Sequence, residues 1–257
     1  PVAAPPYPKI ACGVTNALVL WTGVRLPAGA VSLSLAGSGG AALLVRNRLT
    51  GGFDTLVSGT NGLFSCTAAA WRAKYADPET LLSEARLVGG TPGICALTHR
   101  YDHDGENEYD VHAAAAQTFQ VIEVVKEAVT AERDAAGYLY NPTAVPHDET
   151  AKFRIEVNPP GAVPDSDIVW AVAQGANRVS IVGGDRGREV TIKGESAGET
   201  EPFLLVPIVM GLTLDPQPYF RGHVLPETTV TATVWTVSSS PGGPYPANAA
   251  RVSTMIA

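Results

Sequence analysis

The chain has 257 residues, a formal net charge of −7 and only 17% charged residues. This acidic balance, with no run of Lys or Arg, excludes a nucleic-acid-binding surface, because such a surface needs a basic patch for the phosphates. No apolar stretch reaches the ~20 residues of a membrane span. The 45% of hydrophobic residues suffices for the cores of one large or two ordinary domains.

Glycine and proline recur along the whole chain (26 Gly and 20 Pro) without a regular period. This distribution indicates many turns, and many turns indicate many short strands. The prolines within Pro1–Pro8 predict an extended N-terminal arm, because proline fixes φ and donates no hydrogen bond. A chain that begins at Pro1 fits either removal of a secretory signal or a trimmed sequence.

The first half has the pattern of several short strands. Val31–Leu35 alternates apolar and polar residues, as a half-buried strand does. Gly37–Gly40 and Asn61-Gly62 are predicted turns. In Asp77–Ala85, Asp77 suits a helix N-cap and Pro78 the first helical position, so we expect one or two helical turns there. The other predicted strands are Ala17–Trp21, Ala42–Val45, Leu63–Thr67, Gly93–His99 and Thr118–Val124.

The second half continues in the same style, with turns between short apolar runs. Strands at this spacing, with almost no helical periodicity, predict an all-β protein built of antiparallel sandwiches and argue against an α/β fold. We expect two domains, residues 1–125 and 126–257. The predicted strands are Phe153–Val157, Ile168–Val172, Val179–Val182, Val190–Lys193, Phe203–Val209, Tyr219–Val224, Thr229–Val237 and Arg251–Ile256.

Several runs in the second half carry a family resemblance: Ile168–Val172, Val179–Val182, Glu189–Gly194 and Ala197–Glu199. Together they resemble a bacterial immunoglobulin-like domain of the invasin/intimin type, over about Phe153 to Ile208. The resemblance implies that Trp170 packs between two sheets. It also implies a stalk, spacer or adhesin role.

The first half more weakly resembles polycystic-kidney-disease-like or cadherin-like extracellular modules. The residues that carry this are Pro92-Gly93 to Leu97-Thr98, the turn Asp102–Gly105 and Thr118–Val124. The predicted fold class is therefore all-β, with two tandem immunoglobulin-like antiparallel β-sandwiches and a Pro-rich N-terminal arm.

An acidic turn between two predicted strands is the candidate metal site. Carboxylate oxygens at this density suit Ca²⁺, which takes 6–8 oxygen ligands, although an EF-hand register fails because Arg100 would occupy the first ligand position. The alternative is a solvated hairpin turn. His99, His103 and His112 flank the turn and fit either a zinc site or exposed hairpin histidines. The candidate calcium ligands are Asp102, Asp104, Glu106, Glu108 and Asp110.

The three cysteines all lie in the first half, at Cys12, Cys66 and Cys95. We expect either a Cys66–Cys95 disulfide with Cys12 free, or three reduced cysteines that act as small hydrophobic residues.

The segment from Gly194 to Gly198 matches the G-x-S-x-G pattern of a hydrolase nucleophile, with Asp215 and His223 following in order. The pattern requires a strand-to-helix turn, and the residues after Ser196 do not suit a helix. We therefore expect a turn at a strand corner. The glycine-rich run Gly183–Arg188 is likewise predicted to be a β-turn, since it lacks the lysine–serine pair of a phosphate loop.

These observations favour a secreted or cell-surface structural protein: a subunit of a filament, layer, stalk or adhesin. We expect it to assemble with itself by β-strand addition through Pro1–Lys9 or Arg251–Ile256. No nucleic acid or membrane span is expected, and Ca²⁺ is the one candidate cofactor. The alternative is a carbohydrate- or protein-binding module that recognises a host or cell-surface ligand, which exposed tryptophans would favour. A serine hydrolase using Ser196 is the remote alternative.

Overall fold

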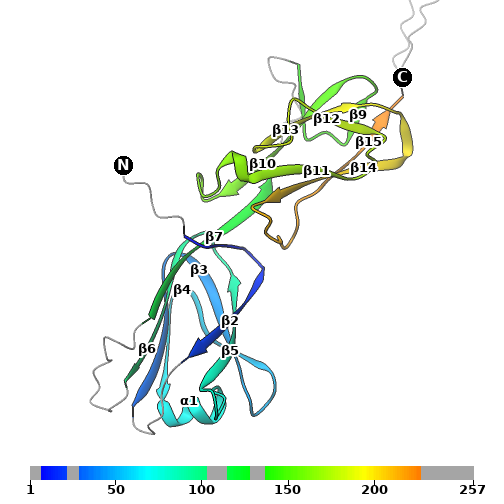
Figure 1. Ribbon diagram of the computed structural model, residues 1–257. Helices are drawn as coiled ribbons and strands as arrows, with labels where there is room; N and C mark the ends of the chain where they lie inside the picture. The colour runs from blue at the N-terminus through cyan, green and yellow to red at the C-terminus, as the bar shows by residue number, and fades with distance from the viewer. Residues whose placement is uncertain (1–6, 22–28, 103–114, 128–136, 227–257) are drawn as a thin grey trace, which may run out of the picture.

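The computed structural model describes residues 7–21, 29–102, 115–127 and 137–226 (Figure 1). Within these residues nearly all of the regular secondary structure is strand, with one short α-helix and one 3₁₀ turn. The prediction of an all-β sandwich protein is therefore confirmed. No helix among the described residues has the length and apolarity to cross a membrane.

The first sandwich is organised around one long central strand. Strand β3 pairs with β4 along one edge, and along its other edge it pairs first with β6 and then with β5. Strand β2 flanks β5, and β7 flanks β6. Its elements are β1 (Lys9–Ala11), β2 (Thr15–Trp21), β3 (Ala30–Arg46), β4 (Phe53–Thr67), α1 (Ala68–Lys74), β5 (Leu82–Gly89), β6 (Gly93–Asp102) and β7 (Ala115–Lys126).

Glycines bend β3 and β4 where turns were predicted. The chain does not reverse at Gly37–Gly40. Instead β3 continues through these residues, its register shifts, and its partner changes from β6 to β5. A Cβ on Gly37 or Gly39 would lie under 3.0 Å from backbone atoms of β6, so the bend requires glycine. Asn61-Gly62 also lies within β4. Both turn predictions are wrong, because a glycine run fits a strand bend as well as a turn.

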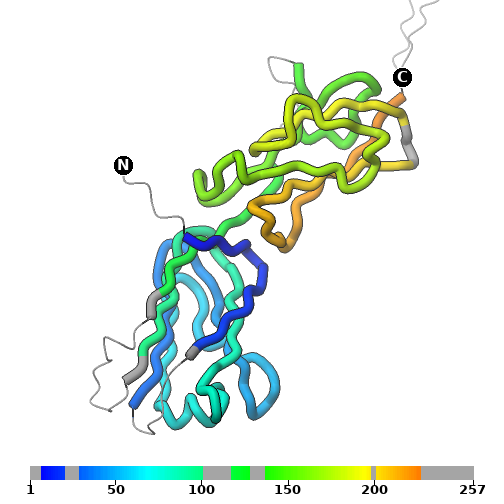
Figure 2. The backbone as a smooth tube through the Cα atoms, in the orientation of Figure 1, coloured from blue at the N-terminus to red at the C-terminus, as the bar shows by residue number. Residues whose placement is uncertain are grey.

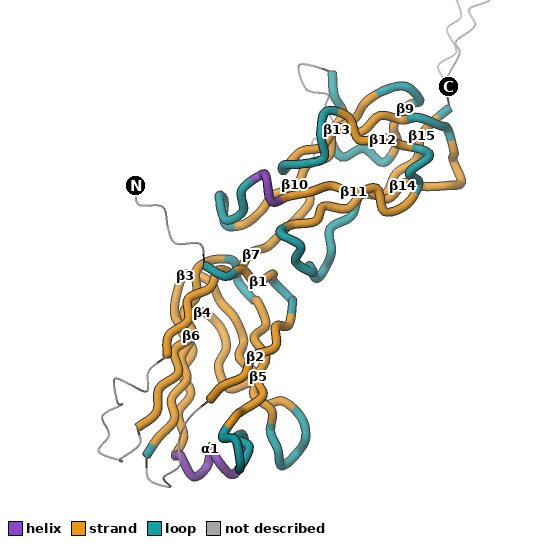
Figure 3. The backbone as a smooth tube through the Cα atoms, in the orientation of Figure 1, coloured by secondary structure: helices purple, strands orange, loops and turns teal. Residues whose placement is uncertain are grey.

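The helix lies earlier in the chain than predicted. Asp77 does not begin a helix: its Oδ1 accepts the backbone N–H groups of Glu79 and Thr80 at 3.0 and 2.9 Å, which closes a local turn before β5. The helix α1 instead follows β4 directly, and Thr67 Oγ1 accepts the N–H of Ala70 at its start. Figure 3 shows α1 at the end of the first sandwich remote from the second, where it places the buried Trp71 in the first core.

The second sandwich has two sheets. One contains β12, β13 and β10 and continues into the end of β7, with β8 beside β10; the other has the order β11-β14-β15-β9. Its elements are β8 (Leu139–Tyr140), β9 (Ala144–Pro146), β10 (Thr150–Asn158), η2 (Asp165–Asp167), β11 (Ile168–Gln174), β12 (Val179–Val182), β13 (Glu189–Gly194), β14 (Gly198–Val209) and β15 (Phe220–Leu225). The strands predicted at Thr229–Val237 and Arg251–Ile256 lie outside the described residues.

Aromatic side chains fill the centre of the second sandwich. Phe153 contacts both Phe203 and Phe220 edge-on, with ring centroids 6.0 and 5.3 Å apart. Trp170 on β11 is buried, and its ring lies 5.6 Å from that of Phe220. The expected packing of Trp170 between the sheets is confirmed.

Each sandwich has its own cluster of buried apolar side chains. The first cluster runs from Ile10 to Val121, and the second includes Ala11 and then runs from Ile122 to Val224. The division of the chain at residues 125 and 126 stays a prediction, because β7 contributes side chains to both clusters.

Candidate functional site: the junction between the two cores

Strand β7 belongs to both sandwiches. Residues 115–121 pair with β6 along one edge. Residues 120–122 also pair with β1, and residues 123–126 pair with β10 of the second sandwich. Figure 1 shows β7 running from one sandwich into the other. We define the junction as β1, residues 120–126 of β7 and the loop 210–219.

Neighbouring residues of the junction strands enter different cores. Val121 is fully buried in the first core and Ile122 in the second. Ile10 and Ala11, their register partners on β1, divide in the same way. This follows from strand geometry, since successive side chains point to opposite faces. The pair of strands therefore closes both cores at once.

Close backbone contacts hold the junction together. Gly13 has a φ of +76°, and a Cβ there would lie under 3.0 Å from the carbonyl oxygen of Asp215 in the loop 210–219. A Cβ on Gly89 would meet the carbonyl of Ala11 equally closely. Figure 2 shows the loop of the second sandwich descending toward the chain after β1. Only glycine permits this approach.

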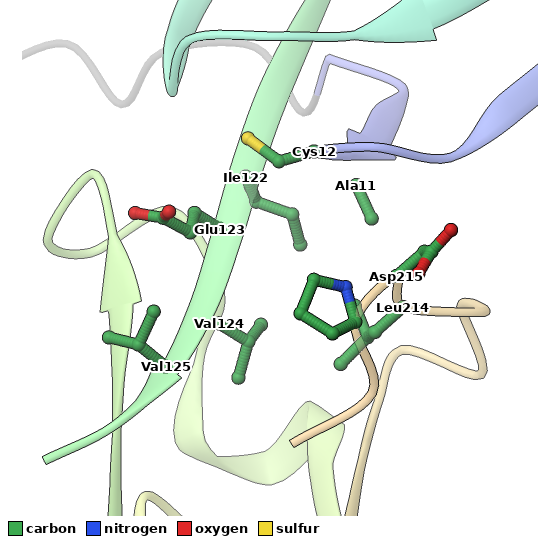
Figure 4. A pocket seen from close by; sticks show the side chains of 9 residues that line it. Ala11, Cys12, Ile122, Glu123, Val124, Val125, Leu214 and Asp215 are labelled. Atoms are coloured by element: carbon green, nitrogen blue, oxygen red, sulfur yellow. The ribbon is translucent and has the colours of Figure 1, made fainter.

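A pocket opens beside the junction (Figure 4). It is lined by Ala11, Cys12, Ile122 to Val125 and Leu214 to Pro216. The Cys12 thiol donates to the carbonyl of Gly90 at 2.8 Å. Burial, and then the negative charge of Glu123, raise the pKa of Cys12. Because the thiolate is the nucleophilic form, Cys12 is suited to packing rather than to covalent chemistry.

Charged side chains fix the segment that follows β7. Arg154 on β10 pairs with Glu127 at 3.2 Å and with Glu189. Asn141 donates to the Glu127 carbonyl at 3.0 Å. The hydrogen bond to Glu189 raises the pKa of Arg154. Burial alone would raise the pKa of Glu189, but hydrogen bonds from Lys152 and Arg154 outweigh it and hold that pKa below its ordinary value.

The predicted calcium site lies almost wholly outside the described residues. Asp102 ends β6, but its side chain is not described, and Asp104, Glu106, Glu108 and Asp110 fall in the range 103–114. Elsewhere in the described chain, no three His, Cys, Asp or Glu side chains are grouped to bind a metal. The calcium site stays a prediction.

The predicted Cys66–Cys95 disulfide is contradicted, because all three cysteines are free thiols. Cys66 on β4 is opposite Val31, and Cys95 on β6 is opposite Gly37, on the other edge of β3. Six residues of strand separate these positions by about 20 Å, whereas a disulfide needs Cα atoms within about 7 Å. The alternative of three reduced cysteines describes the structure.

Of the three histidines considered as zinc ligands, His99 alone is described. It is buried on β6 at 7% exposure, and its Nε2 has no hydrogen-bond partner within the described part of the chain. Burial lowers the pKa of His99. It is therefore a core residue rather than an exposed hairpin histidine, while His103 and His112 lie outside the described residues.

The hydrolase pattern does not form a catalytic triad. Ser196 lies in the turn between β13 and β14, where its Oγ contacts Arg178 Nη1 at 3.1 Å. Asp215 follows the other end of β14. A strand of twelve residues spans about 36 Å, so the serine and the carboxylate cannot act together. His223 lies on β15, paired with Ala144 of β9.

The glycine-rich run between β12 and β13 has a structural role that the sequence did not indicate. The Trp170 backbone N–H donates to the backbone carbonyl of Asp185 at 2.7 Å, and its indole N–H donates to the Gly187 carbonyl at 2.8 Å. Gly187 in turn donates to Ile168. The run thus covers the open edge of β11 and fixes the core tryptophan.

Two of the four tryptophans can be tested as a sugar-binding face. Trp71 is fully buried and Trp170 is 2% exposed, so both are core residues. The side chain of Trp21 and the whole of Trp235 are outside the described part of the chain.

No family model and no curated protein sequence matches the chain. Among solved structures it is similar to domains 4 and 5 of the S-layer protein SbsC, at 13% identity over 55% of this chain and 69% of that chain (TM-score 0.23). It is also similar to the C-terminal domain of the AgI/II polypeptide BspA of Streptococcus agalactiae, at 11% identity over 84% and 95% (TM-score 0.29). A third is InvD of Yersinia pseudotuberculosis, at 15% identity over 92% and 58% (TM-score 0.25). At these scores the similarities assign neither a family nor a function.

Proposed function

We propose that the chain is a structural module of an extracellular surface assembly, in which two immunoglobulin-like sandwiches act as one stiff spacer. The observation that carries this is β7, whose main-chain hydrogen bonds continue from β6 and β1 to β10. Tandem domains joined by an ordinary linker move relative to each other. Here a relative motion would break strand pairing and open both cores.

The alternatives have less support. Sugar recognition by a tryptophan face loses two of its four candidates, because Trp71 and Trp170 are core residues. The hydrolase pattern at Ser196 has its carboxylate at the opposite end of β14. A protein-binding role is compatible with a stiff spacer, since an adhesin also needs to hold its contact surface away from the cell.

Assembly by β-strand addition is part of this proposal. The N-terminal arm is a poor donor beyond its first residues, because the Pro8 carbonyl accepts the Gln120 N–H and Lys9 pairs in the same strand ladder. These residues are already part of their own sheet. We therefore place the donor strand in the C-terminal part of the chain.

The direct test is electron microscopy of the purified chain and of native material, with and without a chelator. Ordered polymers with a repeat that matches two tandem sandwiches would support the proposal. Monodisperse monomers at every concentration, in both preparations, would overturn it. Polymers that disperse only with the chelator would assign calcium, held by Asp102 and the acidic residues that follow, to the assembly.

A further inference from the structure

Strand β4 has the longest open edge among the described strands. It has fifteen residues and pairs with β3 alone, and no other backbone hydrogen bond joins it to any described residue. The edge strand β2 has only seven residues. The equally short β11 is covered by the run around Asp185.

Residues 61–67 of this edge lack the features that normally prevent strand addition, because both register shifts of the β3–β4 ladder fall before Asn61. Edge strands are usually protected by Lys, Pro, inward-pointing charges or short length. From Thr55 to Thr67, β4 contains no charged residue and no proline. No described residue pairs with the N–H and C=O groups on its outer side, which are therefore suited to pairing with another strand.

The apolar side chains near the C-terminal end of β4 are incompletely covered. Phe64 and Cys66 pack against the first core and yet remain half-buried. Leu63, which points away from the core, is 74% exposed. A strand laid along residues 61–67 would complete the cover of these side chains and satisfy the free backbone groups.

The chain itself contains a segment suited to this edge. Thr229–Val237 alternates Thr with Val or Ala over most of its length and has no charge, glycine or proline, a composition typical of strands. It lies outside the described residues and begins three residues after Pro226. Three extended residues span about 10 Å, and β15 ends at the far end of the second sandwich from β4 (Figure 1). The segment can therefore reach the β4 edge of another copy but not its own.

We propose that Thr229–Val237 of one copy adds as a strand to the edge of β4, at residues 61–67, of the next copy. This inference rests on the proposed function and names its contact. The donor and acceptor surfaces differ, and β15, which precedes the donor segment, belongs to the other sandwich from β4. Such a contact between different surfaces is heterologous. It produces a linear polymer when the rotation between successive copies does not close them into a ring.

The test compares two single variants with their mixture. Leu63→Lys places a charge on the acceptor edge but leaves the donor intact, and Val234→Lys does the reverse. We expect each variant alone to sediment as a monomer at concentrations where the unaltered chain polymerises. An equimolar mixture should form a 1:1 complex, because one good acceptor and one good donor remain. Val19→Lys, at an exposed position of β2, and Ser239→Lys, just beyond the donor segment, are the matched controls and should polymerise.

Circular dichroism and thermal unfolding of each variant establish that it is folded. We expect Leu63→Lys to fold, because the Leu63 side chain is exposed. If the variants polymerise like the unaltered chain, or the mixture stays monomeric, this inference is wrong while the proposed function stands. If the unaltered chain itself never polymerises, homo-assembly and this inference fail together.

Discussion

Three buried polar atoms in the first core lack a hydrogen-bond partner among the described residues: Trp71 Nε1, Ser83 Oγ and His99 Nε2. Such atoms are costly because burial removes their hydration. His99 differs from the others because it can also take up a proton, and burial lowers the pKa at which it does so.

We predict that His99 makes the first sandwich sensitive to mild acid. Burial makes the imidazole harder to protonate in the folded state than in the unfolded chain, where it titrates near its ordinary value of 6.5. As the pH falls below 6.5 the unfolded state binds the proton first, so the free energy of unfolding decreases until the folded-state pKa is passed. Urea unfolding at pH 7.5 and 5.5 should show a smaller decrease for His99→Gln. Equal decreases would refute the role of His99.

The cysteines give a second prediction at this scale. Cys66 and Cys95 lie on β4 and β6, which flank β3 on opposite sides. Three thiols per chain should therefore react with a thiol reagent under denaturing, non-reducing conditions. Burial raises the pKa of both residues, so both should react slowly in the native state. A reductant should leave the melting temperature unchanged. Detection of one thiol and one disulfide would contradict the strand register.

At the scale of elements, the junction depends on the approach of Gly13 to the loop 210–219. Gly51 provides a control, because it has nearly the same φ (+75°) but nothing within 4 Å of its Cβ position. We expect Gly51→Ala to cost about 1 kcal/mol of unfolding free energy from backbone strain alone. Gly13→Ala should cost about 2 kcal/mol or more, since the new Cβ must also displace Asp215. Equal losses in denaturant unfolding would show that the contact contributes nothing.

The sequence predicted the strands well, because alternation directly reports which side chains face a core, as in Val31–Leu35. It failed where tertiary contacts decide the outcome. The segment Gly37–Gly40 has the composition of a turn. Only the close approach of β6 shows that it is a bend within a strand. The helix α1 was missed because Thr67, which caps its start, was assigned to the end of the predicted strand Leu63–Thr67.

The junction left a signal in the sequence that was not used. In Phe119–Val125 the alternation breaks at Val121-Ile122 and again at Val124-Val125. Adjacent apolar residues indicate a strand covered on both faces, which is the situation of β7. The candidate calcium site, in contrast, was inferred from local composition alone, and its residues lie outside the described part of the chain.

For the whole molecule, the central claim is that β7 makes the two sandwiches one stiff body. Residual dipolar couplings of backbone amides test this directly, because they report the orientation of each N–H bond in a common frame. We predict that a single alignment tensor fits the couplings of both sandwiches and that Gly13→Ala weakens this agreement. Two tensors of clearly different magnitude in the unaltered chain would contradict the account.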